Sequence, residues 1–249
     1  MKTILITGAS SGIGKHTALA FNKTGHQLIL LSRRKDKLDS LASELNVPTQ
    51  VIAADVSNTM TLQAHIDALP ESFRSIDVLV NNAGLAQGMD PAYSANFNDW
   101  QTMINTNITG LLASTHVVLP TMVKRNQGHI INVGSVAALY PYAGGNVYGA
   151  TKSFVHQFSK NLRADLLGTN IKVTIIAPGV VKTDFFDVRF KGDKSQADAV
   201  FKGFKPLEPE DIARTIHWAV EQPEHVNINL IEVMPTRQAP STITIKRDN

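Results

Sequence analysis

The chain has 249 residues, of which 43% are hydrophobic and 18% charged, and its formal net charge is +3. This size and composition predict a single domain with a large core, and the small basic surplus, which forms no cluster or known motif, argues against a nucleic-acid binder. The absence of cysteine excludes disulfides, thiolate metal sites and a cysteine nucleophile.

The first residues, MKTILITGAS, favour a β-strand over an export signal or a membrane helix, because the apolar run is short and ends at Gly8. With neither an export signal nor disulfides, we expect a cytoplasmic protein that does not bind membranes.

Short apolar runs then alternate with longer helical patterns. The runs are rich in Val, Ile and Leu, and they predict buried strands at 3–7, 27–31, 49–55, 76–84, 128–135, 171–179 and 229–235. The helical patterns lie at 13–24, 35–45, 59–69, 97–124, 146–167 and 209–222. This alternation predicts an α/β fold with a doubly wound sheet of about seven parallel strands and helices on both faces, in one domain spanning 1–249.

Residues 183–207 interrupt the alternation with a mixture of aromatic residues, charges and glycines. An insertion at this point of a doubly wound sheet lies over the carboxyl ends of the strands, where ligands bind. We therefore predict that it is a substrate lid.

A glycine-rich loop, TGASSGIGKHTA, follows the first strand and contains Gly8, Gly12 and Gly14. Glycines between a strand and a helix allow a tight turn and let backbone N–H groups approach a pyrophosphate. The spacing differs from the G-x-G-x-x-G dinucleotide fingerprint, so an ordinary turn remains the alternative.

The end of the second strand indicates which dinucleotide binds. An NAD site usually has an acidic residue here, but Ser32 is followed by Arg33 and Arg34. Because a guanidinium pairs well with a 2′-phosphate, the sequence predicts NADP. The alternative is a solvated basic start to the next helix, which we expect for Lys35 and Lys37.

Further polar motifs follow in chain order: NNAG at 81–84, NTNITG at 105–110, Ser135, YGATK at 148–152 and PG at 178–179. Together with the glycine-rich loop they resemble the short-chain dehydrogenase/reductase family, from Thr7 to about Thr183. The resemblance implies a Rossmann-type sheet of seven parallel strands and a dimer or tetramer. We expect a homotetramer in which helices 97–124 and 146–167 pair between subunits.

The resemblance implies a catalytic set of Asn107, Ser135, Tyr148 and Lys152. Tyr148 and Lys152 lie one helical turn apart, so Lys152 and an oxidised nicotinamide are expected to lower the phenol pKa from its usual value of about 10. Tyr148 then exchanges a proton with the substrate oxygen, and Ser135 holds that oxygen. Asn107 is expected to hold a water that links Lys152 to solvent, with Asn105 as the competing candidate.

The same resemblance places the adenine near Asp55 and Val56, its ribose near Asn82 and the nicotinamide near the PGVVKT loop. Asp55 could instead cap the helix that starts near Thr59. The positions expected to bind the cofactor are Gly8, Ser10, Ser11, Gly12, Ile13, Gly14, Arg33, Arg34, Asp55, Val56, Asn82, Tyr148, Lys152, Pro178, Gly179, Val181 and Thr183.

The stretches NNAGLAQGMDPA, YPYAGGNVYGATKSFV, VRFKGD and HVNINLIEVMPTRQ resemble the NADP-dependent 3-hydroxy acid dehydrogenases. This implies substrates such as serine, allo-threonine or 3-hydroxypropionate with malonic semialdehyde, bound at Ser135 and Tyr148. The substrate carboxylate needs a cation in a dry site, and Arg189 is the candidate, ahead of Lys182 and Lys191. A solvated Arg189 on a mobile lid is the alternative. Other residues expected to shape the pocket are Tyr142, Gly144, Asn146 and Phe185.

Two other functions stay open: a ketoreductase for bulkier carbonyls such as a β-ketoacyl thioester, and a non-catalytic NADP-binding sensor. The histidines are scattered and predict no metal site, and His156 is expected to pack in a core or interface. The final segment, STITIKRDN at 241–249, could pack across a tetramer axis or fray in solvent.

Overall fold

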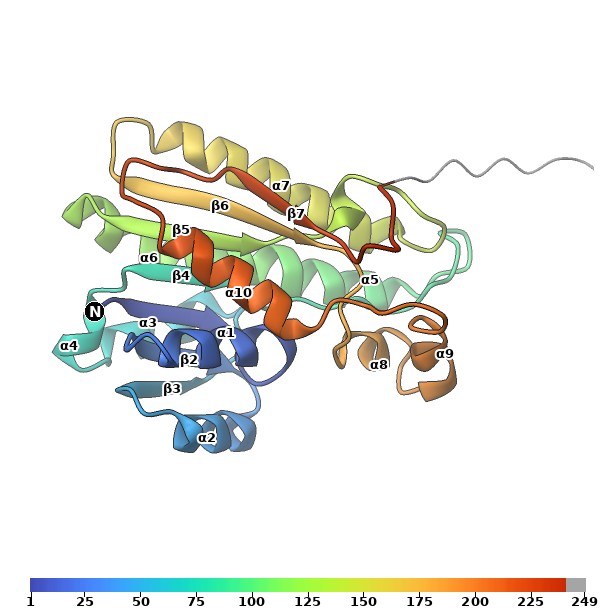
Figure 1. The fold of residues 1–249 in the computed structure, drawn as a ribbon, viewed down its shortest axis with the longest axis horizontal. Coiled ribbons are helices and arrows are strands. Elements are labelled where there is room, and N and C mark those ends of the chain that lie inside the picture. Colours follow the sequence, from blue (N-terminus) through green and yellow to red (C-terminus); the bar gives the residue numbers. More distant parts are fainter. Residues whose placement is uncertain (241–249) are drawn as a thin grey trace, which may run out of the picture.

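A parallel sheet of seven strands runs through the centre of the computed structural model, which describes residues 1–240 (Figure 1). The strand order is β3-β2-β1-β4-β5-β6-β7. The strands are β1 (Thr3–Thr7), β2 (Gln27–Ser32), β3 (Thr49–Ala53), β4 (Val78–Asn81), β5 (Gly128–Val133), β6 (Ile171–Pro178) and β7 (Leu230–Val233). The prediction for 241–249 lies outside the described residues.

Helices cover both faces of the sheet, because successive strand residues point to opposite sides. Ile4 and Ile6 of β1 pack in one core with α1 (Gly12–Asn22), α2 (Lys35–Glu44) and α10 (Pro209–Val220). Leu5 packs in the other core with α3 (Thr59–Asp67), α6 (Gly110–Arg125) and α7 (Asn146–Asp165). The predicted doubly wound α/β fold is therefore confirmed.

Two parts of the chain differ from the prediction. The predicted helix at 97–124 consists of α5 (Phe97–Ile104), a π-helical turn η1 (Asn105–Thr109) and α6. The segment 183–207, predicted as irregular, contains α8 (Phe185–Arg189) and α9 (Lys194–Ala199). A π-turn takes up an extra residue within a continuous apolar pattern, and helices as short as α8 and α9 leave little periodicity to detect. Two more short elements that the pattern missed are α4 (Glu71–Arg74) and the 3₁₀ turn η2 (Val136–Ala138).

The strand order reverses between β1 and β4: β2 and β3 lie on one side of β1, and β4 begins the other half of the sheet. In such sheets a crevice opens at the carboxyl ends of the strands that flank the reversal. In Figure 1, α8 and α9 lie beyond the arrowheads that mark these strand ends.

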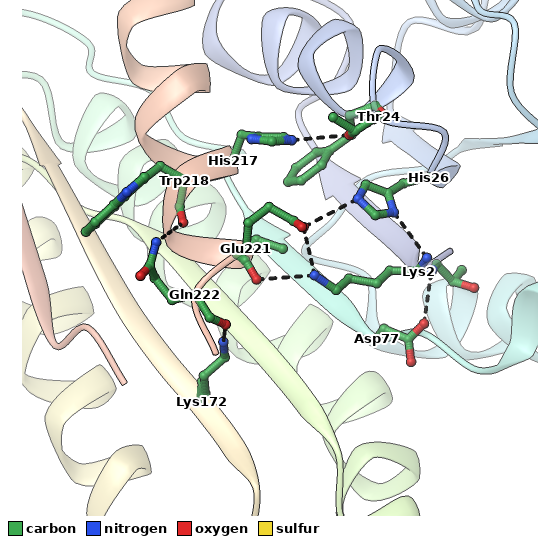
Figure 2. Close-up of polar contacts among 12 residues, drawn as sticks. Lys2, Thr24, His26, Asp77, Lys172, His217, Trp218, Glu221 and Gln222 are labelled. Carbon is green, nitrogen blue, oxygen red and sulfur yellow. Dashed lines mark hydrogen bonds and ion pairs between the residues drawn. The ribbon is translucent and has the colours of Figure 1, made fainter. Parts of the chain in front are cut away.

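Polar contacts join three elements at the opposite, amino-terminal ends of the strands (Figure 2). Lys2 Nζ donates to Glu221 Oε1 at 2.7 Å, and His26 Nε2 lies 3.4 Å from the same oxygen. His26 Nδ1 accepts from the backbone N–H of Lys2 at 3.2 Å, so the Nε2 atom carries the proton of a neutral ring. These contacts tie the starts of β1 and β2 to the end of α10, far from the crevice.

None of the helices within residues 1–240 combines the length and the apolar character needed to cross a membrane.

Candidate active site

A cavity of about 670 Å³ opens at the carboxyl ends of β1, β2, β4, β5 and β6. It extends from the glycine-rich loop, past Arg33 and Asp55, to Ser135, Tyr148 and Arg189. All of the predicted site residues line it except Gly14 and Asn107. The topology therefore brings together side chains that are far apart in the sequence.

The glycine-rich loop has little room for side chains. Gly8 adopts φ +67°, and a Cβ atom there would lie 2.9 Å from the Asn82 amide. A Cβ atom on Gly14 would lie 2.4 Å from the carbonyl oxygen of Gly8, so Gly14 allows α1 to pack closely on the loop. No side chain caps the first turn of α1. Its backbone N–H groups are thus available to a phosphate.

The two arginines after β2 are exposed at the rim of the cavity. Arg34 Nη2 donates to the hydroxyls of Ser10 and Ser11, at 2.8 and 2.7 Å. This guanidinium is thereby held beside the glycine-rich loop, and β2 ends in Ser32 without an acidic residue. The arrangement suits a 2′-phosphate.

Asp55 does not cap α3, so that alternative is wrong: the N-cap is Asn58, which accepts from the Thr61 N–H. Asp55 instead accepts from the hydroxyl and the N–H of Ser57, and these hydrogen bonds lower the pKa of its carboxyl. Val56 beside it is buried.

Asn82 closes the other side of the glycine-rich loop. Its side-chain amide donates to the carbonyl oxygen of Thr7 at 2.9 Å, which joins the ends of β1 and β4. On the far side of the cavity, Pro178, Gly179, Val181 and Thr183 line the wall after β6.

Tyr148 and Lys152 lie one turn apart on α7, and both are buried beside the cavity. Lys152 Nζ is 6.0 Å from the centroid of the Tyr148 ring and donates to the Val133 carbonyl at 2.9 Å. Ser135 lies just beyond β5, where its hydroxyl accepts from the Ala137 N–H. The shared face predicted from the YGATK spacing is therefore observed.

Burial dominates the pKa of Tyr148 in the protein without a bound cofactor. Burial raises it to about 12, whereas the hydrogen bond with Ser135 and the positive charge of Arg189 lower it by less. Burial also lowers the pKa of Lys152, to about 8. In the protein alone, desolvation of the phenolate therefore outweighs the charge of Arg189, and the lowering expected when an oxidised nicotinamide is bound stays a prediction.

Asn107 lies behind the cavity rather than in its wall, in the π-turn η1. Its amide donates to the Leu85 carbonyl at 2.9 Å and to Thr151 Oγ1 at 3.0 Å, and its oxygen accepts from the Leu85 N–H at 2.9 Å. Asn105, the competing candidate, is exposed. The side chain of Asn107 thus links η1 to the loop after β4 and to α7.

Arg189 on α8 is the predicted cation that the fold buries, with 4% of its surface exposed. Its guanidinium carbon lies 5.6 Å from the centroid of the Tyr148 ring, and its buried Nε atom has no hydrogen-bond partner within the described part of the chain. No carboxylate of residues 1–240 forms an ion pair with it. In contrast, Lys182 is exposed and Lys191 pairs with Asp99 at 2.7 Å.

Of the residues expected to shape the pocket, Tyr142 and Phe185 line the cavity, whereas Gly144 and Asn146 do not. The Phe185 ring lies 5.5 Å from the Tyr148 ring. His156 packs in the core, where a Cβ atom on Gly134 would collide with its ring. The described residues contain no cluster of His, Asp and Glu side chains that could hold a metal ion.

Sequence reasoning missed part of the cavity wall. The lid contributes apolar side chains, and so does the loop after β7. The stretch NLIEVMPTRQ at 229–238, which contains β7 and most of this loop, was the sequence signal that could have indicated the second group. The missed residues include Met89, Thr106, Tyr140, Phe186, Phe190, Val200, Met234, Gln238 and Ala239.

Comparisons with known proteins agree with this geometry. A model of the short chain dehydrogenase family matches residues 2–194. The chain is 49% identical to the NADP-dependent 3-hydroxy acid dehydrogenase YdfG of Salmonella typhi, across 98% of this chain and 99% of that protein. It is 48% identical to the serine 3-dehydrogenase of Agrobacterium fabrum, across 99% of both chains.

Two solved structures extend the likeness to three dimensions. The closed form of a serine dehydrogenase complexed with NADP⁺ superimposes with a TM-score of 0.97 at 47% identity, across 99% of this chain and 100% of that one. The serine dehydrogenase of Escherichia coli gives 0.85 at 45% identity, across 95% and 99%. From its motifs, its sheet and these matches, the chain belongs to the short-chain dehydrogenase family.

Proposed function

We propose that this protein is an NADP-dependent oxidoreductase that transfers hydride between NADP(H) and a small 3-hydroxy acid or its 3-oxo acid. The substrate class is supported by relatives named for 3-hydroxy acids and for serine. The observation that carries it is Arg189: a buried cation that pairs with no carboxylate of residues 1–240, beside Tyr148 in the cavity wall. A buried charge is costly unless it is paired, so this site favours an anionic substrate.

The cavity fits a phosphorylated dinucleotide. The uncapped first turn of α1 and the glycine-rich loop suit the pyrophosphate, and Arg33 with Arg34 suits the 2′-phosphate. When bound there, NADP⁺ supplies the hydride acceptor and NADPH the hydride donor.

The residues of the chain then supply proton transfer and positioning. Tyr148 holds the proton that is exchanged with the substrate oxygen, and Ser135 holds that oxygen beside the phenol. Lys152, buried one turn away, contributes positive charge when protonated and so favours the phenolate. Asn107 keeps α7 in place against the loop after β4 through its bonds to Thr151 and Leu85.

Arg189 would pair with the substrate carboxylate, since no carboxylate of residues 1–240 neutralises its charge. In a 3-hydroxy acid the alcohol carbon is two bonds from the carboxylate carbon. Pairing of the carboxylate with Arg189 would therefore hold the alcohol near Tyr148. Segment 183–207 would act as the lid, because α8 brings Arg189 over the cavity.

The assembly and the compartment are part of the proposal. The protein would be a homotetramer in the cytoplasm. Apolar side chains exposed on α5 and α6, at Phe97, Ile104 and Leu112, support an interface between copies of the chain. Sedimentation of the purified protein measures its size.

Turnover of serine, allo-threonine, 3-hydroxypropionate and 3-hydroxyisobutyrate with NADP⁺ and with NAD⁺ tests the proposed function. We expect oxidation with NADP⁺, and a kcat at least about 100-fold lower for Tyr148→Phe, which has no exchangeable proton. NADPH binding by Tyr148→Phe, followed by fluorescence, should be retained, which shows that the variant is folded. Turnover of β-ketoacyl thioesters alone would indicate a ketoreductase instead, and NADPH binding without any turnover would indicate a sensor.

A further inference from the structure

The guanidinium of Arg189 lies close to two aromatic rings. Its central carbon is 5.3 Å from the centroid of the Tyr142 ring and 5.6 Å from that of Tyr148. Arg189 Nη1 donates to the Tyr142 hydroxyl at 2.8 Å, and Nη2 lies 3.4 Å from the Gly144 carbonyl oxygen. Two of its nitrogens thus bond to the loop before α7, and Nε has no hydrogen-bond partner among the described residues.

That loop is built to place the Tyr142 ring. A Cβ atom on Gly145 would lie 2.7 Å from the ring, so only glycine allows the ring to rest there. Gly144 adopts φ +75°, and a Cβ atom on it would lie 2.2 Å from the carbonyl oxygen of Met89. The two glycines therefore allow the close backbone approach that brings the Tyr142 hydroxyl to the lid residue Arg189.

Without Tyr142, the Arg189 side chain could adopt several orientations. Arginine has several rotatable bonds, and fixing it costs side-chain entropy on binding. The hydrogen bond and the ring contact remove part of this cost in advance, because they hold the guanidinium before substrate binds.

We propose that Tyr142 is a positioning residue that sets the selectivity for substrates with a carboxylate, by holding Arg189 in the cavity wall. This inference rests on the proposed function. Tyr142 acts through Arg189 and takes no part in proton transfer, so its loss should weaken the binding of acids and leave the chemical step intact.

The test compares 3-hydroxypropionate with its methyl ester, which has the same alcohol but no negative charge. We expect Tyr142→Phe to raise KM for the acid about tenfold, as for loss of one hydrogen bond to a charged group, with kcat changed less than about twofold. KM for the ester should stay unchanged. Gly145→Ala should cause the same selective rise, because it displaces the ring. Tyr93→Phe, at a residue that is 92% exposed, is the matched control.

A double-mutant cycle with Arg189→Met separates positioning from direct contact. If Tyr142 acts through Arg189, Tyr142→Phe adds no further rise in KM for the acid when Arg189 is already Met. An undiminished second rise would overturn the inference, because it would mean that Tyr142 contacts the substrate itself. An unchanged KM of Tyr142→Phe for the acid would overturn it too.

Failure of the proposed function is visible separately, in the wild type. If the wild-type protein does not distinguish the acid from its ester, the carboxylate role of Arg189 is wrong, whatever the Tyr142 variants do. NADPH binding and circular dichroism of each variant show that it folds, so a selective change in KM does not reflect unfolding.

Discussion

Whether a charged residue can bind an anionic substrate depends on its surroundings, as Arg189 shows. In the sequence it is one of several basic residues near the lid, together with Lys182 and Lys191. In the structure, Lys182 is exposed and Lys191 is neutralised by Asp99, but Arg189 is buried without a carboxylate among the described residues. Desolvation of a cation is costly, and a bound anion offsets that cost.

Arg189→Ala should therefore weaken the binding of acids selectively. We expect KM for 3-hydroxypropionate to rise about 100-fold, in line with the removal of one partner of a buried charge pair, and KM for its methyl ester to change little. Steady-state kinetics on both substrates measures the difference. Lys182→Ala, which removes an exposed cation outside the cavity wall, serves as the control. Equal effects of Arg189→Ala on the acid and the ester would rule out the carboxylate role.

The π-turn η1 determines which asparagine of NTNIT faces inward. An extra residue in the turn changes the direction of the side chains, so Asn107 is buried while Asn105 is exposed. Both donors and the oxygen of the Asn107 amide are bonded to Leu85 and Thr151. Through Asn107, η1 is thus joined to two other parts of the site, the loop after β4 and α7.

Asn107→Ala should affect both stability and activity. It would leave the N–H and the carbonyl of Leu85 without their partner, which costs about 1–3 kcal/mol of the free energy of unfolding. We expect kcat to fall as well, because α7 carries Tyr148 and Lys152. Urea titration and turnover measure the two effects. Asn105→Ala, two residues away and exposed, should change neither, and an equal response of the two variants would contradict this account.

At the scale of the whole molecule, burial makes stability depend on pH. His129 is buried in β5, where its Nε2 bonds to Thr174 Oγ1 at 2.8 Å, and burial lowers its pKa to about 3. The unfolded chain has a histidine pKa of about 6.5. Between these values the unfolded state binds more protons, so this contribution to stability is complete above pH 6.5 and decreases as the pH falls.

Below pH 6.5, His129 should make the free energy of unfolding fall by about 1.4 kcal/mol for each pH unit. We expect His129→Gln to reduce the difference between the free energies of unfolding at pH 7 and pH 5, measured by urea titration at one protein concentration. His65→Gln, at an exposed position on α3, should leave that difference as it is in the wild type. An unchanged difference in His129→Gln would show that the histidine does not carry the effect.

The sequence by itself determined the parts that depend on neighbouring residues. Buried strands such as 3–7 appear as short apolar runs, because both faces of a parallel sheet are covered. The glycines after β1 indicate a close backbone approach, and the spacing of Tyr148 and Lys152 predicts one shared helix face. These features need only local geometry, so they could be predicted before the fold was known.

Only the tertiary structure decided the features that depend on distant residues. The pKa of Tyr148 rises because the fold buries its hydroxyl, and the spacing of residues in the sequence does not reveal this burial. The contact between Tyr142 and Arg189 joins the loop before α7 to the lid, and the π-turn directs Asn107 to Leu85 and Thr151. Desolvation and side-chain pairing are properties of the packed molecule, which is why a linear pattern does not contain them.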